Sequence, residues 1–275
     1  MLNMPFLAGL SIIVGFLGSL TGLGGASILI PIMVLLGVPV KEAIACGMVA
    51  IIATSSGSAS SYVRERLANV RIAMFLEMFT ITGAIAGATI TTLIAPVYLY
   101  FFFAAFLLTS FLKLKEPMGT FVPAVSQDRL SRWLHLEGGY FDEAIRQKID
   151  YRANNALLGG LGMLVAGLAA GMLGIGAGAF KVTVQENILK MPPKVSSTTS
   201  NFIIGMTALA GVSVYLFSGL LNLTLMAPMA IGTTIGAIVG GRILNKLSNQ
   251  TLRILFYIII VFLVVQMLYK GVTSL

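Results

Sequence analysis

Two short glycine motifs are the segments of this sequence best suited to binding a ligand. The first is Gly22-Leu-Gly-Gly-Ala-Ser27, and the second is Gly174-Ile-Gly-Ala-Gly178. Glycine lets a helix break and lets other groups approach the backbone closely. Where a helix restarts after a break, its unpaired N–H groups and positive dipole end favour an anion. Close packing of helices through small residues is the alternative explanation. The expected binding residues are Gly22, Gly24, Gly25, Gly174, Gly176 and Gly178.

One lysine and two glutamates lie within or beside apolar stretches, where a charged side chain is costly and is by default a functional candidate. Lys181 follows the second glycine motif, and we expect it to receive an anionic substrate. The alternatives are pairing with Glu186 or with a neighbouring helix, and extension of the ammonium to the membrane surface. Glu77 and Glu186 are the candidate proton carriers. An interfacial ion pair with Arg71 or Arg64 is the competing interpretation for Glu77, and a solvated position is the one for Glu186.

Hydroxyl side chains gather in two clusters, at residues 54–61 and 196–201. In membrane helices such groups commonly bond to carbonyls of their own helix or join neighbouring helices. Three or more together exceed that need and can donate hydrogen bonds to an oxyanion. The residues that we expect to contact the substrate are Thr54, Ser55, Thr198, Thr199 and Asn201.

Other chemistry finds little support in the sequence. Cys46 and His135 are the only cysteine and histidine, which falls short of the usual ligand set of a zinc site. The sequence contains neither a nucleophile elbow nor a Walker A loop. We therefore expect that the protein is not an enzyme and that it binds neither a metal nor another cofactor. The formal charge of +8 is carried mostly by short loops between apolar runs, where it sets membrane topology rather than binding nucleic acid.

These candidate residues must be positioned by helices inside a membrane. Of the 275 residues, 57% are hydrophobic and only 10% are charged, which is typical of a multi-pass membrane protein. The apolar runs at residues 5–36 and 155–189 are too long for one crossing and carry the glycine motifs midway. Each is therefore expected to form a broken, re-entrant helical hairpin. Spanning helices are expected at residues 43–63, 72–95, 97–112, 195–218, 223–244 and 252–269.

The two halves of the chain are repeats. A shift of 152 residues pairs Gly22 with Gly174, and one inserted residue near Pro192 changes the shift to 153, which pairs Thr54 with Thr207. Matching loops carry opposite charge: three arginines lie between residues 64 and 71, whereas the equivalent loop at 217–222 has no basic residue. This bias predicts repeats that are inverted across the membrane. The predicted fold is an all-α integral membrane protein of two inverted repeats, each with a re-entrant hairpin and three transmembrane helices.

The same charge bias predicts the domain organisation and the location of each segment. We expect an N-terminal membrane repeat at 1–112, a cytoplasmic linker at 113–152 and a C-terminal membrane repeat at 153–275, with both termini outside. Residues 126–135 of the linker are expected to form an interfacial amphipathic helix in contact with the lipid bilayer. Small residues at helical spacing, such as Gly83 and Gly87, are compatible with a homodimer and equally with internal packing.

The glycine motifs also carry a resemblance to a known family. Gly22-Leu-Gly-Gly, followed by Pro31 and by Gly37-Val-Pro-Val-Lys-Glu-Ala, is similar to the first repeat of the sulfite exporter TauE/SafE family. Gly174-Ile-Gly-Ala-Gly, followed by Pro192-Pro-Lys-Val, is similar to its second repeat. The similarity extends over nearly the whole chain outside 113–152. Departures occur at Ala26 and Ala177, where the family usually has glycine, and at Thr183, where it often has proline.

The resemblance implies a secondary transporter of the bacterial inner membrane that exports a small sulfur-containing anion. Sulfite, sulfoacetate and other organosulfonates are the expected substrates. Export against a gradient requires coupling, for which Glu77 and Glu186 are the candidate proton sites. A passive anion channel of the same fold is the first alternative, and a membrane enzyme or receptor subunit is the second.

Overall fold

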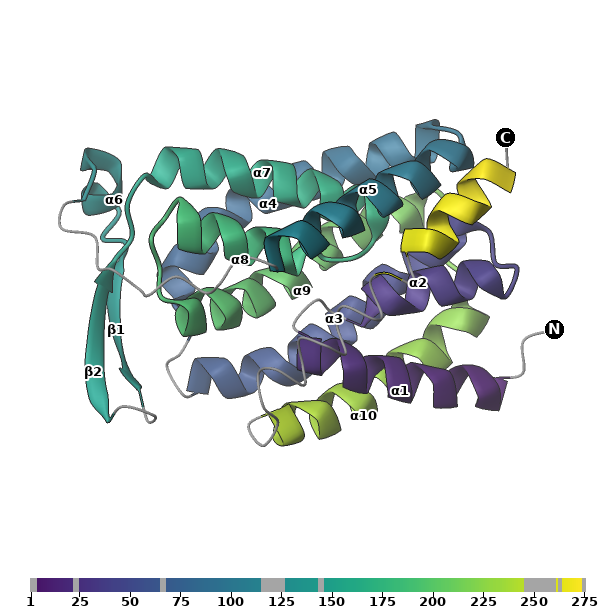
Figure 1. Ribbon diagram of the computed structural model, residues 1–275, viewed down its shortest axis with the longest axis horizontal. Coiled ribbons are helices and arrows are strands. Elements are labelled where there is room, and N and C mark those ends of the chain that lie inside the picture. Colours follow the sequence, from purple (N-terminus) through teal and green to yellow (C-terminus); the bar gives the residue numbers. More distant parts are fainter. Residues whose placement is uncertain are drawn as a thin grey trace.

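The computed structural model describes residues 4–21, 25–64, 68–114, 127–142, 146–244, 261 and 264–273, and it is mostly helical (Figure 1). Five of the described helices contain an apolar stretch long enough to cross a membrane, as an integral membrane protein requires. Most of the run expected at 252–269 lies outside the described residues. The elements are α1 (Met4–Thr21), α2 (Ala26–Leu35), α3 (Val40–Arg64), α4 (Val70–Leu93), α5 (Pro96–Leu114), α6 (Arg129–Trp133), β1 (Glu137–Asp142), β2 (Gln147–Arg152), α7 (Ala156–Leu173), α8 (Gly178–Asn187), α9 (Pro193–Phe217) and α10 (Leu223–Leu244).

Both overlong apolar runs are broken at their glycine motifs, as predicted. The first run divides into α1 and α2, and the second divides into α7 and α8. In the second break the backbone is left-handed, with φ of +65° at Gly174, +71° at Gly176 and +51° at Ala177. Glycine adopts this conformation without the steric cost that a Cβ atom brings. The breaks therefore follow from the residues at these positions.

The helix boundaries repeat along the chain. α1 and α7 begin and end 152 residues apart, and so do α2 and α8. α3 and α9 begin and end 153 residues apart, so the inserted residue lies in the connection between α8 and α9. The first three helices of the two halves therefore correspond in length and order.

The two halves interlock through pairs of helices. α1 packs along α10, and α4 packs along α7 (Figure 1). The first helix of the set α1–α4 therefore contacts the last helix of the set α7–α10, and the last helix of the first set contacts the first helix of the second. Glycine makes this contact close. A Cβ atom added to Gly83 would lie 2.2 Å from the backbone oxygen of Leu164, and one added to Gly236 would lie 2.0 Å from that of Ile12. The small residues at helical spacing serve internal packing.

The outer surface of the helices is apolar, whereas the interior contains polar groups. Leu93, Leu209 and Leu223 are more than half exposed, while Lys181 and Gln185 are fully buried. This arrangement suits a protein whose surroundings are hydrocarbon, because apolar side chains lose nothing by facing lipid.

The expectation of an all-helical chain is wrong for part of the linker. β1 and β2 form an antiparallel hairpin in which Glu137 lies opposite Arg152 and Asp142 opposite Gln147. The buried Tyr140 lies between the exposed residues Gly139 and Phe141, and the buried Tyr151 lies between the exposed residues Asp150 and Arg152. This period of two buries one face of the hairpin against α4. A short helix, α6, lies within the stretch 126–135 where an amphipathic helix was predicted, and it is five residues long.

Asn69 holds this hairpin against the membrane helices. Its side-chain oxygen accepts a hydrogen bond from the backbone N–H of Ile72 at 3.1 Å, which caps α4. Its side-chain nitrogen donates to the hydroxyl of Tyr151 at 2.9 Å and to the backbone oxygen of Glu137 at 3.2 Å. One residue thus stabilises both the start of a spanning helix and the position of the hairpin.

We expect the substitution Asn69→Ala to lower the free energy of unfolding by about 2–3 kcal/mol, since it removes a helix cap, a partly buried hydrogen bond to Tyr151 and an exposed one to Glu137. Asn69→Ser keeps a capping oxygen but is too short to reach Tyr151, so it should recover about half of that loss. Thermal unfolding of both variants in one detergent measures the difference. Equal destabilisation by alanine and serine would show that the cap contributes little.

Candidate functional site

A lysine, a threonine and a glutamate meet inside the protein where α4, α8 and α9 come together. The ammonium nitrogen of Lys181 donates a hydrogen bond to Oγ1 of Thr207 at 2.9 Å, and this oxygen lies 3.2 Å from Oε1 of Glu77. Lys181 and Thr207 are completely buried, and Glu77 is 3% exposed. A threonine hydroxyl therefore bridges a buried cation and a buried carboxyl group.

The hydroxyl of Thr207 also lies 2.7 Å from the backbone oxygen of Ile203, one turn earlier in α9. A hydroxyl carries a single proton, so Thr207 donates either to Ile203 or to Glu77 while it accepts from Lys181. When it donates to Ile203, a protonated Glu77 can in turn donate to Thr207. The arrangement therefore suits both the ionised and the protonated form of Glu77.

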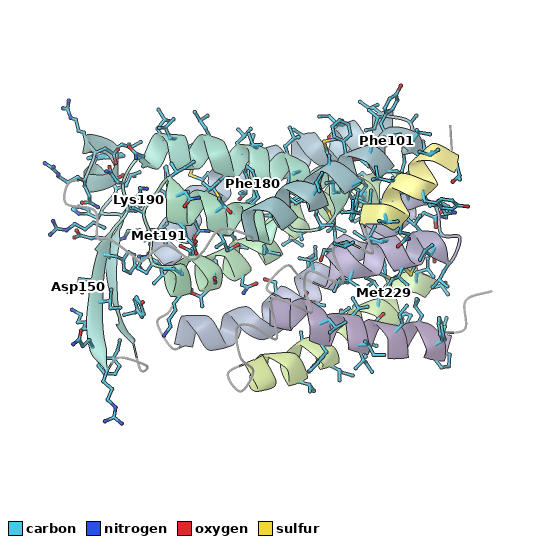
Figure 2. All side chains as sticks on the ribbon, viewed as in Figure 1. Phe101, Asp150, Phe180, Lys190, Met191 and Met229 are labelled. Atoms are coloured by element: carbon cyan, nitrogen blue, oxygen red, sulfur yellow. The ribbon has the colours of Figure 1, made fainter. Side chains whose placement is uncertain are left out.

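The helix break positions Lys181 in the interior. α8 begins at Gly178, and the backbone oxygen of Gly178 accepts a hydrogen bond from the hydroxyl of Ser200 on α9 at 3.4 Å. Lys181 stands six residues before the end of α8, which corresponds to about 9 Å of helix. Figure 2 shows its neighbour Phe180 within the helical bundle, whereas Lys190 lies at the end that carries the β-hairpin.

The structure corrects the competing interpretation of Glu77. This residue does not form an interfacial ion pair with Arg71, whose guanidinium donates instead to the backbone oxygen of His135 at 3.4 Å. The side chain of Arg64 lies outside the described residues.

Lys181 is not paired with Glu186, which is half-buried in the last turn of α8. Its partner is on a neighbouring helix, as one of the alternatives anticipated.

Further buried polar groups extend this site along α8 and α9. Gln185 follows Lys181 by one helical turn and is completely buried, and neither its amide nitrogen nor its oxygen has a hydrogen-bond partner. The hydroxyl of Ser196 and Oε2 of Glu77 are also buried without a partner. An unpartnered buried polar atom costs about 1–3 kcal/mol, so such atoms are expected where a ligand or a bound water can satisfy them.

The hydrogen bonds described for the predicted hydroxyl residues are made to backbone groups rather than to Lys181. The hydroxyl of Ser55 donates to the backbone oxygen of Asn201 at 2.6 Å, which joins the two helices. The hydroxyls of Thr54 and Thr198 bond to carbonyls of their own helices, at 2.8 Å and 2.9 Å respectively. The hydroxyl of Thr199 accepts a hydrogen bond from the backbone N–H of Asn69 at 3.1 Å.

The glycines of the second motif make close contacts with neighbouring helices. A Cβ atom added to Gly174 would lie 2.7 Å from the backbone oxygen of Ile44, and one added to Gly176 would lie 2.9 Å from Ile204. Gly25 precedes α2 and packs against α1. Gly22 and Gly24 lie outside the described residues.

In the described part of the chain, His, Cys, Asp and Glu side chains form no group of three that could hold a metal ion.

The family of the chain follows from a comparison with known proteins. The family model described as "Sulfite exporter TauE/SafE" matches residues 7–267. The chain belongs to this family. Membership confirms the resemblance seen in the glycine motifs and makes the protein a membrane transporter, which is a class distinct from enzymes.

Two relatives of this TauE/SafE protein come from Bacillus subtilis (strain 168). The chain is 24% identical to the probable membrane transporter protein YunE, over 99% of this chain and 100% of that protein. It is 25% identical to the probable membrane transporter protein YdhB, over 89% of this chain and 90% of that protein. No solved structure matches the chain.

Two residues of the site in this TauE/SafE protein, Thr207 and Gln185, were not among the predicted site residues. A signal existed for Thr207, because it is the repeat partner of Thr54. Neither charged neighbour of Thr207 has a charged repeat partner. Leu29 in the first half corresponds to Lys181, and Ala230 in the second half corresponds to Glu77. The site therefore belongs to the second broken hairpin and α4.

Proposed function

We propose that this protein is a secondary transporter that exports a small sulfur-containing anion, such as sulfite, sulfoacetate or another organosulfonate, across the bacterial inner membrane together with protons. The observation that carries this proposal is the buried contact of Lys181 with Thr207 and, through it, with Glu77. A buried ammonium beside unpartnered polar atoms is suited to receiving an oxyanion. Membership of the TauE/SafE family supports sulfite or a related anion as the substrate.

Competition for Lys181 provides the coupling to protons. An oxyanion that binds the ammonium takes the place of Glu77 as its charge partner. A buried carboxylate without a partner is strongly unfavourable, so Glu77 takes up a proton as the anion binds. Proton and anion are therefore expected to bind together, with Gln185, one helical turn after Lys181, supplying further hydrogen bonds to the anion.

The charge of the bound complex accounts for export. A dianion such as sulfite that is bound together with one proton keeps a net negative charge. A membrane potential that is negative inside drives this charge outward, with about 2.3 kcal/mol per elementary charge at 100 mV. Net outward movement therefore needs no further energy source as long as the potential outweighs the opposing proton gradient and any opposing concentration gradient of the anion.

Flux measurements in reconstituted vesicles test this function. Vesicles are loaded with sulfite, sulfoacetate, taurine or small carboxylates, and a pH-sensitive dye reports proton movement under an imposed potential. We expect selective efflux of one sulfur anion, with protons moving in the same direction, and no such flux with Lys181→Met. Leakage of many anions without proton movement would instead indicate a passive anion channel.

We also propose that the two halves are inverted repeats, with both termini outside and residues 113–152 in the cytoplasm. Two observations support this orientation. In Figure 1 the hairpin α1–α2 opens toward the end that carries both termini, whereas α7–α8 opens toward the β-hairpin. Basic residues gather at the β-hairpin end, as expected of a cytoplasmic face. They include Arg71, Arg129, Arg132, Arg146, Lys148, Arg152, Lys190 and Lys194.

Cysteine labelling of intact cells tests this orientation. Cys46 is the only native cysteine and is completely buried, so Cys46→Ser provides a silent background. In this background, Thr273→Cys at an exposed position should react with an impermeant maleimide added outside. Asp150→Cys on the exposed hairpin should react only after the membrane is opened. The reverse pattern would contradict the orientation.

A further inference from the structure

A basic hollow lies beside α6, at the end of the protein that carries the β-hairpin. It has a volume of about 610 Å³ and is lined by Arg129, Leu130, Arg132, Trp133 and His135. Trp133 is 75% exposed, which is unusual for the largest apolar side chain. The hollow thus combines two guanidinium groups with an exposed aromatic ring, and the proposed transport function uses none of these residues.

Hydrogen bonds fix α6 at the start of α7. The backbone N–H of Ala156 donates to the hydroxyl of Ser131 at 3.3 Å, and the backbone N–H of Asp128 donates to the side-chain oxygen of Asn154 at 2.9 Å. Figure 1 shows α6 beside the first turns of α7. The outward face of α7 is apolar from its second residue onward, where Leu157 and Leu158 are more than half exposed. The hollow therefore lies where the lipid-facing surface begins.

We propose that this hollow binds the headgroup of an anionic phospholipid, whose acyl chains lie along the exposed face of α7. Guanidinium groups match the geometry of a phosphate and donate paired hydrogen bonds to it. A tryptophan ring is favoured at the level of lipid headgroups because one end is apolar and the other can donate a hydrogen bond. Basic residues close to an anionic membrane surface each strengthen binding.

The acidic side chains nearby are already engaged. The carboxylate of Asp128 accepts hydrogen bonds from the backbone N–H and the hydroxyl of Ser131, which caps α6. The carboxylate of Glu137 pairs with Arg152 at 3.8 Å. The guanidinium group of Arg132 donates one hydrogen bond, to the backbone oxygen of Gln127 at 3.3 Å. Neither Arg129 nor Arg132 makes an ion pair in the part of the chain that the structure describes. Their charge is available to an anionic lipid.

The fluorescence of Trp133 tests this proposal directly, because it is the only tryptophan in the chain. The protein is placed in bilayers that contain either brominated phosphatidylglycerol or brominated phosphatidylcholine at equal mole fraction. We expect brominated phosphatidylglycerol to quench Trp133 several-fold more strongly. Equal quenching by the two lipids, or quenching by neither, would overturn the proposal.

Matched variants identify the residues responsible. Arg129→Ala combined with Arg132→Ala should weaken the apparent affinity for brominated phosphatidylglycerol about tenfold. Arg146→Ala combined with Lys148→Ala removes the same charge from the hairpin and should leave that affinity unchanged. Loss of the preference in both double variants would show a diffuse electrostatic effect and overturn the site. Displacement of the lipid by soluble glycerol phosphate at similar concentration would overturn it in favour of a site for a free phosphate.

Discussion

Replacing Lys181 with methionine is expected to abolish anion transport and also to destabilise the protein. Methionine fills a similar volume but leaves Glu77 as a buried carboxyl group without its cation. Removing one partner of a buried charge pair typically costs about 3–5 kcal/mol. We therefore expect a fall in transport rate of at least about 100-fold, together with a clear drop in the unfolding temperature. Lys190 is exposed in the connection between α8 and α9, so Lys190→Met is the matched control. It should change neither the transport rate nor the unfolding temperature.

A double substitution separates the two effects. Lys181→Met combined with Glu77→Gln removes both charges, so the unfolding temperature should return close to that of the native protein. Transport should stay absent, because the anion has lost its cation. If the single Lys181→Met variant is as stable as the native protein and still transports the anion, then Lys181 neither pairs with Glu77 nor belongs to the site.

The second large effect is expected at the break between α7 and α8. Gly174→Ala places a Cβ atom at a residue with φ of +65°, at 2.7 Å from the backbone oxygen of Ile44. The left-handed conformation costs a residue other than glycine about 1–2 kcal/mol, and overpacking adds about 1–3 kcal/mol. We expect the free energy of unfolding to fall by about 2–5 kcal/mol.

Gly219 provides the control for this substitution. Its φ is +69°, and an added Cβ atom would meet nothing within 4 Å. Gly219→Ala should therefore show only the conformational cost. Unfolding of both variants in the same detergent and denaturant gives the difference, which measures how tightly the break is held against α3. Equal losses at the two positions would mean that the contact with Ile44 relaxes at no cost.

Much of the fold was predictable because its signals are local. Glycine motifs in the middle of overlong apolar runs indicated both helix breaks, and the shift between repeats indicated which helices correspond. The β-hairpin was missed because its alternation extends over only six residues per strand and includes charged residues that also suit a solvated linker. A period of two over so short a stretch is a weak signal beside the long apolar runs around it.

The site was less predictable than the fold, since it depends on which helices become neighbours. Lys181 and Glu77 were each recognisable as charges in apolar surroundings. Their shared contact at Thr207 requires α9 of one half to lie against both α4 of the other half and α8, and no local pattern specifies that arrangement. Arg71 is the partner of Glu77 that proximity in the sequence favours, but α4 directs the two side chains to different surroundings.

The interlocked pairing of helices has a consequence for how the chain is made. The glycine-lined contact between α1 (Met4–Thr21) and α10 (Leu223–Leu244) joins two segments that leave the ribosome far apart in time, because most of the described chain lies between them. Until α10 is inserted, α1 has no partner for its close-packed face. Assembly of the bundle must therefore wait for the second half, and the early helices have to reside in the bilayer, or with the insertion machinery, as an unfinished set.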